Sequence, residues 1–237
     1  MPTMPLKNLQ KKILSRLGLL YGFQAAYRDL RRLIVRLGYF RFSEKKFLSG
    51  TSSKLHLGCG SRKLAGWLNV DLLGSDFNVD LAKMPLPFPD NSFEVIVSQQ
   101  VIEHLRLEAE MIPLLHELFR ILRPGGSLWI SCPDMEKICS SYVQDKGMAL
   151  LEDRLKRYPD FKWNPSMPSQ HMVNVYFHQE GEHKNLFDFQ MLSLELSSAG
   201  FVGINRASED MLLNEFKDIP LRNDDFHSVY VLARKFV

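Results

Sequence analysis

Two glycines and one acid in the first third of the chain could bind a nucleotide. An apolar run at residues 54–58 ends in a Gly58-Cys59-Gly60 turn, and Asp71 follows after a second apolar run. Glycines in such a turn let a ligand approach the backbone, whose amides point at it. A carboxylate at the end of the next strand can accept both ribose hydroxyls of an adenosine. Alone, this pattern indicates a nucleotide without saying which.

The same spacing argues against a nicotinamide dinucleotide. The turn lacks the third glycine of the GxGxxG pattern, in which the acid is expected about twenty residues later, after a full helix. Only a few residues separate the expected strands at 68–71 and 78–81, too few for a full crossover helix. An NAD-linked reductase on a related fold is therefore the less favoured alternative.

Alternating strand and helix patterns continue to the end of the chain. A helix at 108–122 should end before Pro124-Gly125-Gly126, and Asp134 can cap the helix that follows it. Repeated βα units predict an α/β fold with a doubly wound, mostly parallel, seven-stranded Rossmann-like sheet. We expect the last two strands to pair as an antiparallel edge. The other expected elements are strands at 54–58, 68–71, 78–81, 93–98 and 127–132, a helix at 190–199, and strands from 201 and at 228–234.

Several segments in this order and spacing resemble the class I S-adenosylmethionine-dependent methyltransferase superfamily. The match is to methyltransferases of type 11, above all to a small bacterial group often linked to surface polysaccharide biosynthesis. It spans about residues 54–134 and leaves residues 1–50 outside. Its segments are LHLGCGSRKLAGWLNVDL (55–72), Asp80-Leu81, PLPFPDNSFEVIVS (85–98), VIEHL (101–105), LFRILRPGG (118–126) and CPD (132–134).

The resemblance assigns roles to residues of the first three strand ends. Gly58 and Gly60 would lie against the methionine part and the sugar of S-adenosylmethionine. Asp71 would bind the ribose diol. Asp80 would accept a hydrogen bond from the adenine amino group, with the backbone of Leu81 beside the ring.

The end of the fourth strand would face the reacting sulfonium. The resemblance places Ser98 and Gln99 beside the methionine side of the cofactor, with Glu103 and His104 just beyond. Some relatives with Glu-x-x-Glu-His at this position bind a divalent metal. Gln100 stands where the first Glu would be, so we predict no metal.

Catalysis of methyl transfer is mainly in-line positioning of the acceptor, and an oxygen acceptor must also lose its proton. His171, His178 and His183 lie in one stretch outside the cofactor segments. We select His183 as the candidate base and His104 as the second. His178 and His183 are five residues apart, which does not align them on one helical face, so the stretch does not predict zinc.

The predicted function is transfer of a methyl group to an oxygen, or a nitrogen, of a small-molecule, sugar or glycan-lipid acceptor. The alternative from another class is a catalytically inactive, methyltransferase-like binding or scaffold module. No motif that reads nucleic acid is visible. The acidic pair Asp224-Asp225 is interpreted as solvated charge, and Cys59 as a small filler beneath the glycine turn.

Charge is unevenly distributed along the chain. Residues 1–50 hold eleven Lys/Arg and two Asp/Glu, a net charge of +9, whereas the remainder holds nineteen and twenty-five, a net charge of −6. Apolar residues recur at helical spacing over 5–40. We expect a basic amphipathic helical extension and linker at 1–52 and a methyltransferase domain at 53–237. The extension could cap the domain or contact an anionic membrane. Three cysteines without a CxxC pair favour a cytoplasmic protein, with any membrane contact at the inner face.

Overall fold

The computed structural model describes residues 18–39 and 52–236. Two compact units make up the chain, Met1–Phe42 and Ser43–Val237. In the first unit, helix α2 (Leu20–Tyr39) runs without a break through Gly22. The remainder of the predicted helical segment, residues 5–17, lies outside the described residues, as does most of the linker predicted before residue 53.

The second unit is built on one seven-stranded sheet with the order β3-β2-β1-β4-β5-β7-β6. The first five strands pair in parallel, and β7 is antiparallel to both β5 and β6. This confirms the predicted doubly wound sheet and its antiparallel edge. The strands are β1 (Lys54–Leu57), β2 (Leu68–Asp71), β3 (Phe77–Asn78), β4 (Phe93–Gln99), β5 (Leu122–Pro133), β6 (Val202–Ala207) and β7 (Ser228–Arg234).

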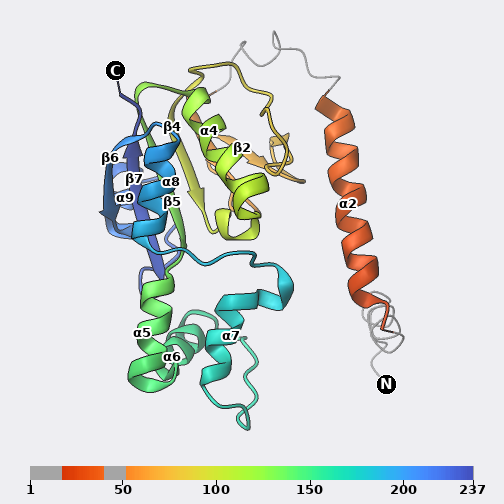
Figure 1. Ribbon diagram of the computed structural model, residues 1–237, viewed down its shortest axis with the longest axis vertical. Coiled ribbons are helices and arrows are strands. Elements are labelled where there is room, and N and C mark those ends of the chain that lie inside the picture. The colour runs from red at the N-terminus through yellow and green to blue at the C-terminus, as the bar shows by residue number, and fades with distance from the viewer. Residues whose placement is uncertain (1–17, 40–51, 237) are drawn as a thin grey trace. The chain divides into compact units, whose positions relative to one another are not determined.

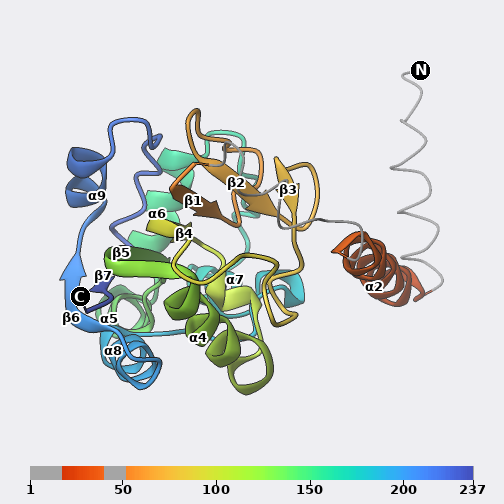
Figure 2. The same cartoon turned by 90° about the horizontal axis from the view of Figure 1, so that it is seen from above.

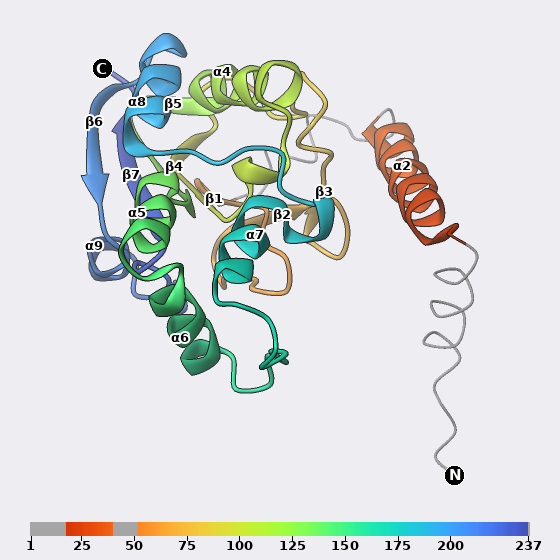
Figure 3. The same ribbon diagram turned by 60° about the horizontal axis from the view of Figure 1, so that its bottom comes forward.

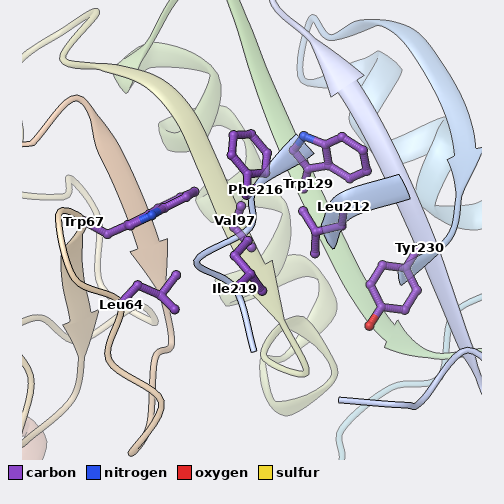
Figure 4. Close-up of a cluster of buried hydrophobic side chains, with 8 residues drawn as sticks. All are labelled: Leu64, Trp67, Val97, Trp129, Leu212, Phe216, Ile219 and Tyr230. Atoms are coloured by element: carbon purple, nitrogen blue, oxygen red, sulfur yellow. The ribbon is translucent and has the colours of Figure 1, made fainter. Parts of the chain in front are cut away.

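Helices cover both faces of the sheet. Figure 2 shows α4 (Ile112–Ile121) and α8 (Phe189–Ser198) on one face and α9 (Glu209–Glu215) on the other. On the α9 face, Trp67 packs edge-on against Phe216, with ring centroids 5.4 Å apart. Figure 4 shows the cluster around this pair, in which side chains from β4, β5, β7, α9 and the neighbouring loops exclude water from the sheet.

Most predicted boundaries agree with the structure to within one residue, and three elements differ by more. The strand predicted at 78–81 is shortened to β3, because the chain turns at Asp80, whose side chain accepts a hydrogen bond from the Ala82 amide. The helix predicted at 108–122 begins as a π-helical turn, Leu107–Met111, before α4. Strand β5 already includes the Pro124-Gly125-Gly126 segment. A Cβ on Gly126 would lie 2.9 Å from the carbonyl oxygen of Glu94, so the glycine permits close approach to β4.

A helical insertion lies beyond the carboxyl ends of the parallel strands, between β5 and α8. Figures 1 and 3 show its helices side by side: α5 (Met135–Asp145), α6 (Met148–Arg157) and α7 (Gln170–His178). The insertion has its own apolar core, which includes Ile138, Leu150 and Met172. Asp134 caps α5 as predicted, accepting a hydrogen bond from the Glu136 amide. The sequence analysis did not predict α6, α7 or α9.

Candidate active site

The glycine turn follows β1 directly, and its conformation requires glycine. Gly58 and Gly60 both have positive φ, at 69° and 54°. A Cβ added to Gly58 would lie 2.2 Å from Cγ2 of Val101, whereas nothing lies within 4 Å of a Cβ added to Gly60. The first glycine therefore lets the end of β1 lie close to Val101, in the segment that follows β4. The second leaves open space above the turn, where a ligand can reach the backbone.

Asp71, the last residue of β2, is held against this turn. One carboxylate oxygen accepts a hydrogen bond from the Gly60 amide at 2.8 Å, and the other accepts from the Leu72 amide at 2.6 Å. These two bonds fix the carboxylate beside the turn while its side chain stays partly accessible. Glycine turn and acid, predicted from spacing, are thus one hydrogen-bonded unit.

Asp80 and Leu81 extend the same edge of the sheet. Asp80 is 2% exposed and Leu81 is buried, in the turn that follows β3. The Val79 amide donates to the carbonyl oxygen of Asp71 at 2.8 Å, which ties this turn to the end of β2. Cys59 is buried, and burial raises the pKa of its thiol to about 11. It is therefore a neutral filler under the turn, as predicted.

The turn lies where the order of the strands reverses. After β1 the chain moves outward to β2 and then β3, and it returns to the opposite side of β1 as β4. Ser98, near the end of β4, pairs in register with Leu57 of β1. In open α/β sheets, ligands bind at the carboxyl ends of the strands on either side of such a reversal. The residues predicted for the cofactor therefore converge at the expected place.

Behind the end of β4 lies a buried polar network that the sequence did not reveal. Gln99 donates to the hydroxyl of Tyr230 at 3.4 Å, and Gln100 donates to Asp224 at 3.1 Å. The Tyr230 hydroxyl also donates to Asp224, at 2.5 Å. Arg222 forms an ion pair with the Asp224 carboxylate. Asp224 is only 4% exposed, so its interpretation as a solvated charge was wrong. The paired glutamines at the end of β4 offered the only sequence signal of this network.

Just past β4, a short 3-10 turn (Ile102–His104) presents a buried acid and an imidazole. Glu103 is 1% exposed, and burial raises the pKa of its carboxyl to about 8. Its Oε1 lies 3.9 Å from Nε2 of His104. The ring of His183 stacks edge-on against that of His104, with centroids 5.0 Å apart. Burial lowers the pKa of both histidines, which favours neutral imidazoles at neutral pH.

His183 reaches this position because the segment leaving the insertion binds along residues 103–105. The Lys184 amide donates to the carbonyl oxygen of Glu103 at 2.8 Å. The Asn185 side chain donates to the carbonyl oxygen of Leu105 at 2.6 Å. The two predicted base candidates, His104 and His183, are therefore brought together from distant parts of the sequence.

The other two histidines of the stretch do not join them. His171 lies beside the ring of Trp163, and His178 is exposed at the end of α7. Glu103, which the sequence analysis noted without selecting it, is the group that completes the cluster. The sequence separation of Glu103 and His183 did not predict their contact, because that contact depends on the fold of the insertion.

Comparison with known proteins bears on this geometry. A family profile described as "Methyltransferase domain" matches residues 77–130, from β3 into β5. A probable S-adenosylmethionine-dependent methyltransferase of Mycolicibacterium smegmatis is 49% identical over 49 residues, 21% of this chain and 18% of that protein. Over these residues the chain is similar to methyltransferases.

Two further likenesses concern more of the chain. A ubiquinone/menaquinone biosynthesis C-methyltransferase of Pseudoalteromonas translucida is 35% identical over 77 residues, 31% of this chain and 30% of that protein. The structure of a SAM-dependent methyltransferase of Methanosarcina mazei aligns with 81% of this chain and 96% of its own, at 17% identity and a TM-score of 0.44. The chain covers less than a third of the length of either sequence relative.

Proposed function

We propose that the chain transfers a methyl group from S-adenosylmethionine to an oxygen, or a nitrogen, of a small-molecule, sugar or glycan-lipid acceptor. The observation that carries this proposal is the hydrogen-bonded unit of the glycine turn and Asp71 at the point where the strand order reverses. Open backbone above Gly60 and a fixed carboxylate beside it suit an adenosine whose ribose and amino-acid parts are both polar.

In this proposal the cofactor lies along the carboxyl ends of three strands. Gly58 and Gly60 contact its methionine part and sugar, and Asp71 accepts the ribose hydroxyls. Asp80 and the backbone of Leu81 bind the adenine. Burial of both residues suits a flat, partly apolar ring with one amino group to satisfy.

The methyl group then faces the end of β4. Ser98 is 1% exposed, and its hydroxyl finds no hydrogen-bond partner within the described part of the chain. A buried hydroxyl without a partner is costly, so a polar ligand at this position would satisfy it. We place the charged methionine end of the cofactor beside Ser98 and Gln99, with the acceptor beyond it.

Methyl transfer itself is a single displacement. A lone pair of the acceptor forms the new bond to the methyl carbon as the carbon–sulfur bond breaks. The electron pair of that bond stays on sulfur, which becomes the neutral thioether of S-adenosylhomocysteine. For a hydroxyl acceptor, the proton must go to a base. We place His183, with His104 as the second candidate, at the acceptor end of the site, because the two rings lie together beyond β4.

Calorimetric titration with S-adenosylhomocysteine tests the cofactor half of this proposal. We expect saturable binding by the full chain and its loss in Asp71→Ala, because that change removes the ribose acceptor. Asp218→Asn, at an exposed aspartate, is the matched control and should bind like the parent. Absence of binding by the unmodified chain at millimolar ligand would contradict the proposal. Binding without turnover on a broad acceptor panel would favour the inactive scaffold module instead.

For α2 we propose contact with an anionic membrane at the inner face. Tyr27, Leu30, Ile34 and Leu37 recur at three- and four-residue steps, and each is more than half exposed. The helix carries four arginines and one aspartate. An apolar stripe with cationic neighbours suits the interface of anionic lipids. No helix in the described ranges is both long and apolar enough to cross a bilayer.

Vesicle co-sedimentation tests this contact. The full chain should pellet with vesicles containing phosphatidylglycerol and less so as salt is added, because salt screens the attraction. Leu30→Ser/Ile34→Ser should weaken pelleting, whereas Leu194→Ser, at an exposed leucine of α8, should not. Equal pelleting of both variants would contradict a role for α2.

A further inference from the structure

The acceptor end of the site holds a buried carboxylate with nothing to bind. Both oxygens of Glu103 are fully buried, and neither has a hydrogen-bond partner among residues 18–39 and 52–236. The approach to Nε2 of His104, at 3.9 Å, is too long for a hydrogen bond. A buried polar group left in this way costs on the order of 1–3 kcal/mol. Glu103 therefore requires a ligand to satisfy it.

The two histidines beside it are oriented for the same ligand. Nδ1 of His104 lies 3.2 Å from the carbonyl oxygen of Glu182, and Nδ1 of His183 lies 2.5 Å from that of Tyr176. A carbonyl oxygen can only accept, so each Nδ1 carries the proton and each Nε2 has a free lone pair. A carbonyl partner on the far nitrogen is the usual arrangement behind a metal-binding histidine.

The three groups converge on one point. One ligand atom from each of Glu103, His104 and His183 lies within 4.8 Å of the others. Proton transfer from an acceptor requires only one imidazole. It does not explain why a second imidazole nitrogen and a carboxylate lie beside the first. A divalent cation uses all three groups at once, and its charge offsets the burial of the carboxylate.

We propose that Glu103, His104 and His183 bind a divalent transition-metal ion at the acceptor end of the proposed site. Two imidazole nitrogens and one carboxylate oxygen favour Mn²⁺, Fe²⁺, Co²⁺ or Zn²⁺ over Mg²⁺ and Ca²⁺, which prefer oxygen donors. This differs from the sequence prediction of no metal, which rested on Gln100 and on the spacing of His178 and His183 and did not combine His183 with Glu103. Gln100 is turned away and binds Asp224 and Ser228.

The inference deepens the proposed function and rests on it for the role of the ion. Three protein ligands leave positions open for an acceptor. A hydroxyl bound there would become more acidic, because the ion would stabilise the alkoxide. With the ion bound, His183 and His104 act as its ligands in place of the role of base, so the proton passes to solvent water. The oxygen lone pair then displaces S-adenosylhomocysteine from the methyl carbon. The acceptor class that fits best has two neighbouring oxygens, which can bind the ion together, as a vicinal diol does.

Metal titration of the full chain, after chelator treatment and dialysis, tests the site. We expect Co²⁺ to give visible absorption bands typical of nitrogen and oxygen ligation, and Mn²⁺ and Zn²⁺ to bind saturably in calorimetry. The loss of an outer partner of a metal ligand typically costs 10–100-fold in affinity, and Glu103→Gln and His183→Gln should each exceed that. His178→Gln, at the exposed histidine five residues before His183, is the control and should bind like the parent.

Two outcomes would overturn the inference: no saturable binding of Co²⁺, Mn²⁺ or Zn²⁺ by the unmodified chain, or equal binding by Glu103→Gln. The cobalt spectrum of the parent decides the matter even where a variant fails to fold. Titration with S-adenosylhomocysteine on the same samples separates this inference from the proposed function. Cofactor binding without metal binding rejects the site alone, and metal binding without cofactor binding rejects the methyltransferase proposal alone.

Discussion

The two ends of the proposed site are built differently. At the cofactor end, the glycine turn, Asp71 and Asp80 fall within about two dozen consecutive residues and are joined mostly through backbone amides. At the acceptor end, Glu103 and His104 meet His183 only after the insertion has folded and its exit segment has bound along residues 103–105. The first end is a property of a local segment of strands and loops, and the second is a property of the tertiary fold.

The two ends therefore differ in how strongly their geometry depends on the rest of the chain. A carboxylate held by the backbone of a turn tolerates changes elsewhere in the chain. A cluster that depends on an inserted helical unit changes whenever that unit changes. We therefore expect variants at the two ends to separate cofactor binding from the properties of the acceptor site.

The largest effect should come from the cofactor end. Gly58→Ala places a Cβ against Val101 and forces a non-glycine residue into positive φ. Backbone strain and overpacking together should lower the free energy of unfolding by roughly 2–5 kcal/mol and abolish S-adenosylhomocysteine binding. Chemical denaturation and calorimetry measure both.

Gly60→Ala is the matched comparison, because open space surrounds its Cβ and only the strain of about 1–2 kcal/mol applies. Adding Val101→Ala to Gly58→Ala should recover part of the stability. Equal losses in the two glycine variants would show that contact with Val101 is not the cause.

A smaller effect is expected where the insertion joins the acceptor end. Asn185→Ala removes the donor to the Leu105 carbonyl and should lower the free energy of unfolding by about 1–3 kcal/mol. It should weaken metal binding while leaving S-adenosylhomocysteine affinity unchanged, which calorimetry with each ligand can measure. Asn174→Ala, at an exposed asparagine of α7, should stay within about 0.5 kcal/mol of the parent. A matching loss of cofactor affinity in Asn185→Ala would remove the distinction between the two ends.

The smallest effect concerns pH and the joint between the insertion and β7. His227 is 4% exposed between Asp153, Arg157 and the ring of Tyr176, with Asp224 also near, and burial lowers its pKa. The unfolded chain then binds the proton more readily than the folded one, so stability is complete above the ordinary histidine pKa of about 6.5 and declines as the pH falls below it.

The slope attributable to one such group is at most about 1.4 kcal/mol per pH unit. His227→Gln should flatten the pH dependence of the free energy of unfolding between pH 6.5 and the lowered pKa, as urea titrations at several pH values can show. Parallel curves for parent and variant would contradict the assignment.

The sequence predicted the parts of the fold that depend on local pattern. Strands β2 and β7 have the predicted bounds, and the few residues between the strands expected at 68–71 and 78–81 correctly indicated that no full helix lies between β2 and β3. The residues proposed for the cofactor could be found from the sequence because a turn and a strand end have their own residue requirements. Glycine at positive φ and an acid at the end of a strand can be recognised without knowledge of the segments that pack opposite them.

The remainder depended on contacts between distant segments. Helices α6 and α7 stabilise each other through a core of their own, which no single periodic pattern displays. In the sequence Asp224 resembles a surface charge, and only the fold brings Tyr230 and Gln100 into hydrogen-bonding contact with it. Glu103 and His183 are eighty residues apart, and only the bound exit segment of the insertion brings them together.

Hydrogen–deuterium exchange of the full chain, with and without S-adenosylhomocysteine, tests the central claim most directly. We predict that the ligand slows exchange in peptides covering residues 58–60, 71–72 and 80–82, with little change in those covering 148–157. Unchanged exchange at the glycine turn and at Asp71 under saturating ligand, or protection confined to the insertion, would contradict a cofactor site at the reversal of strand order.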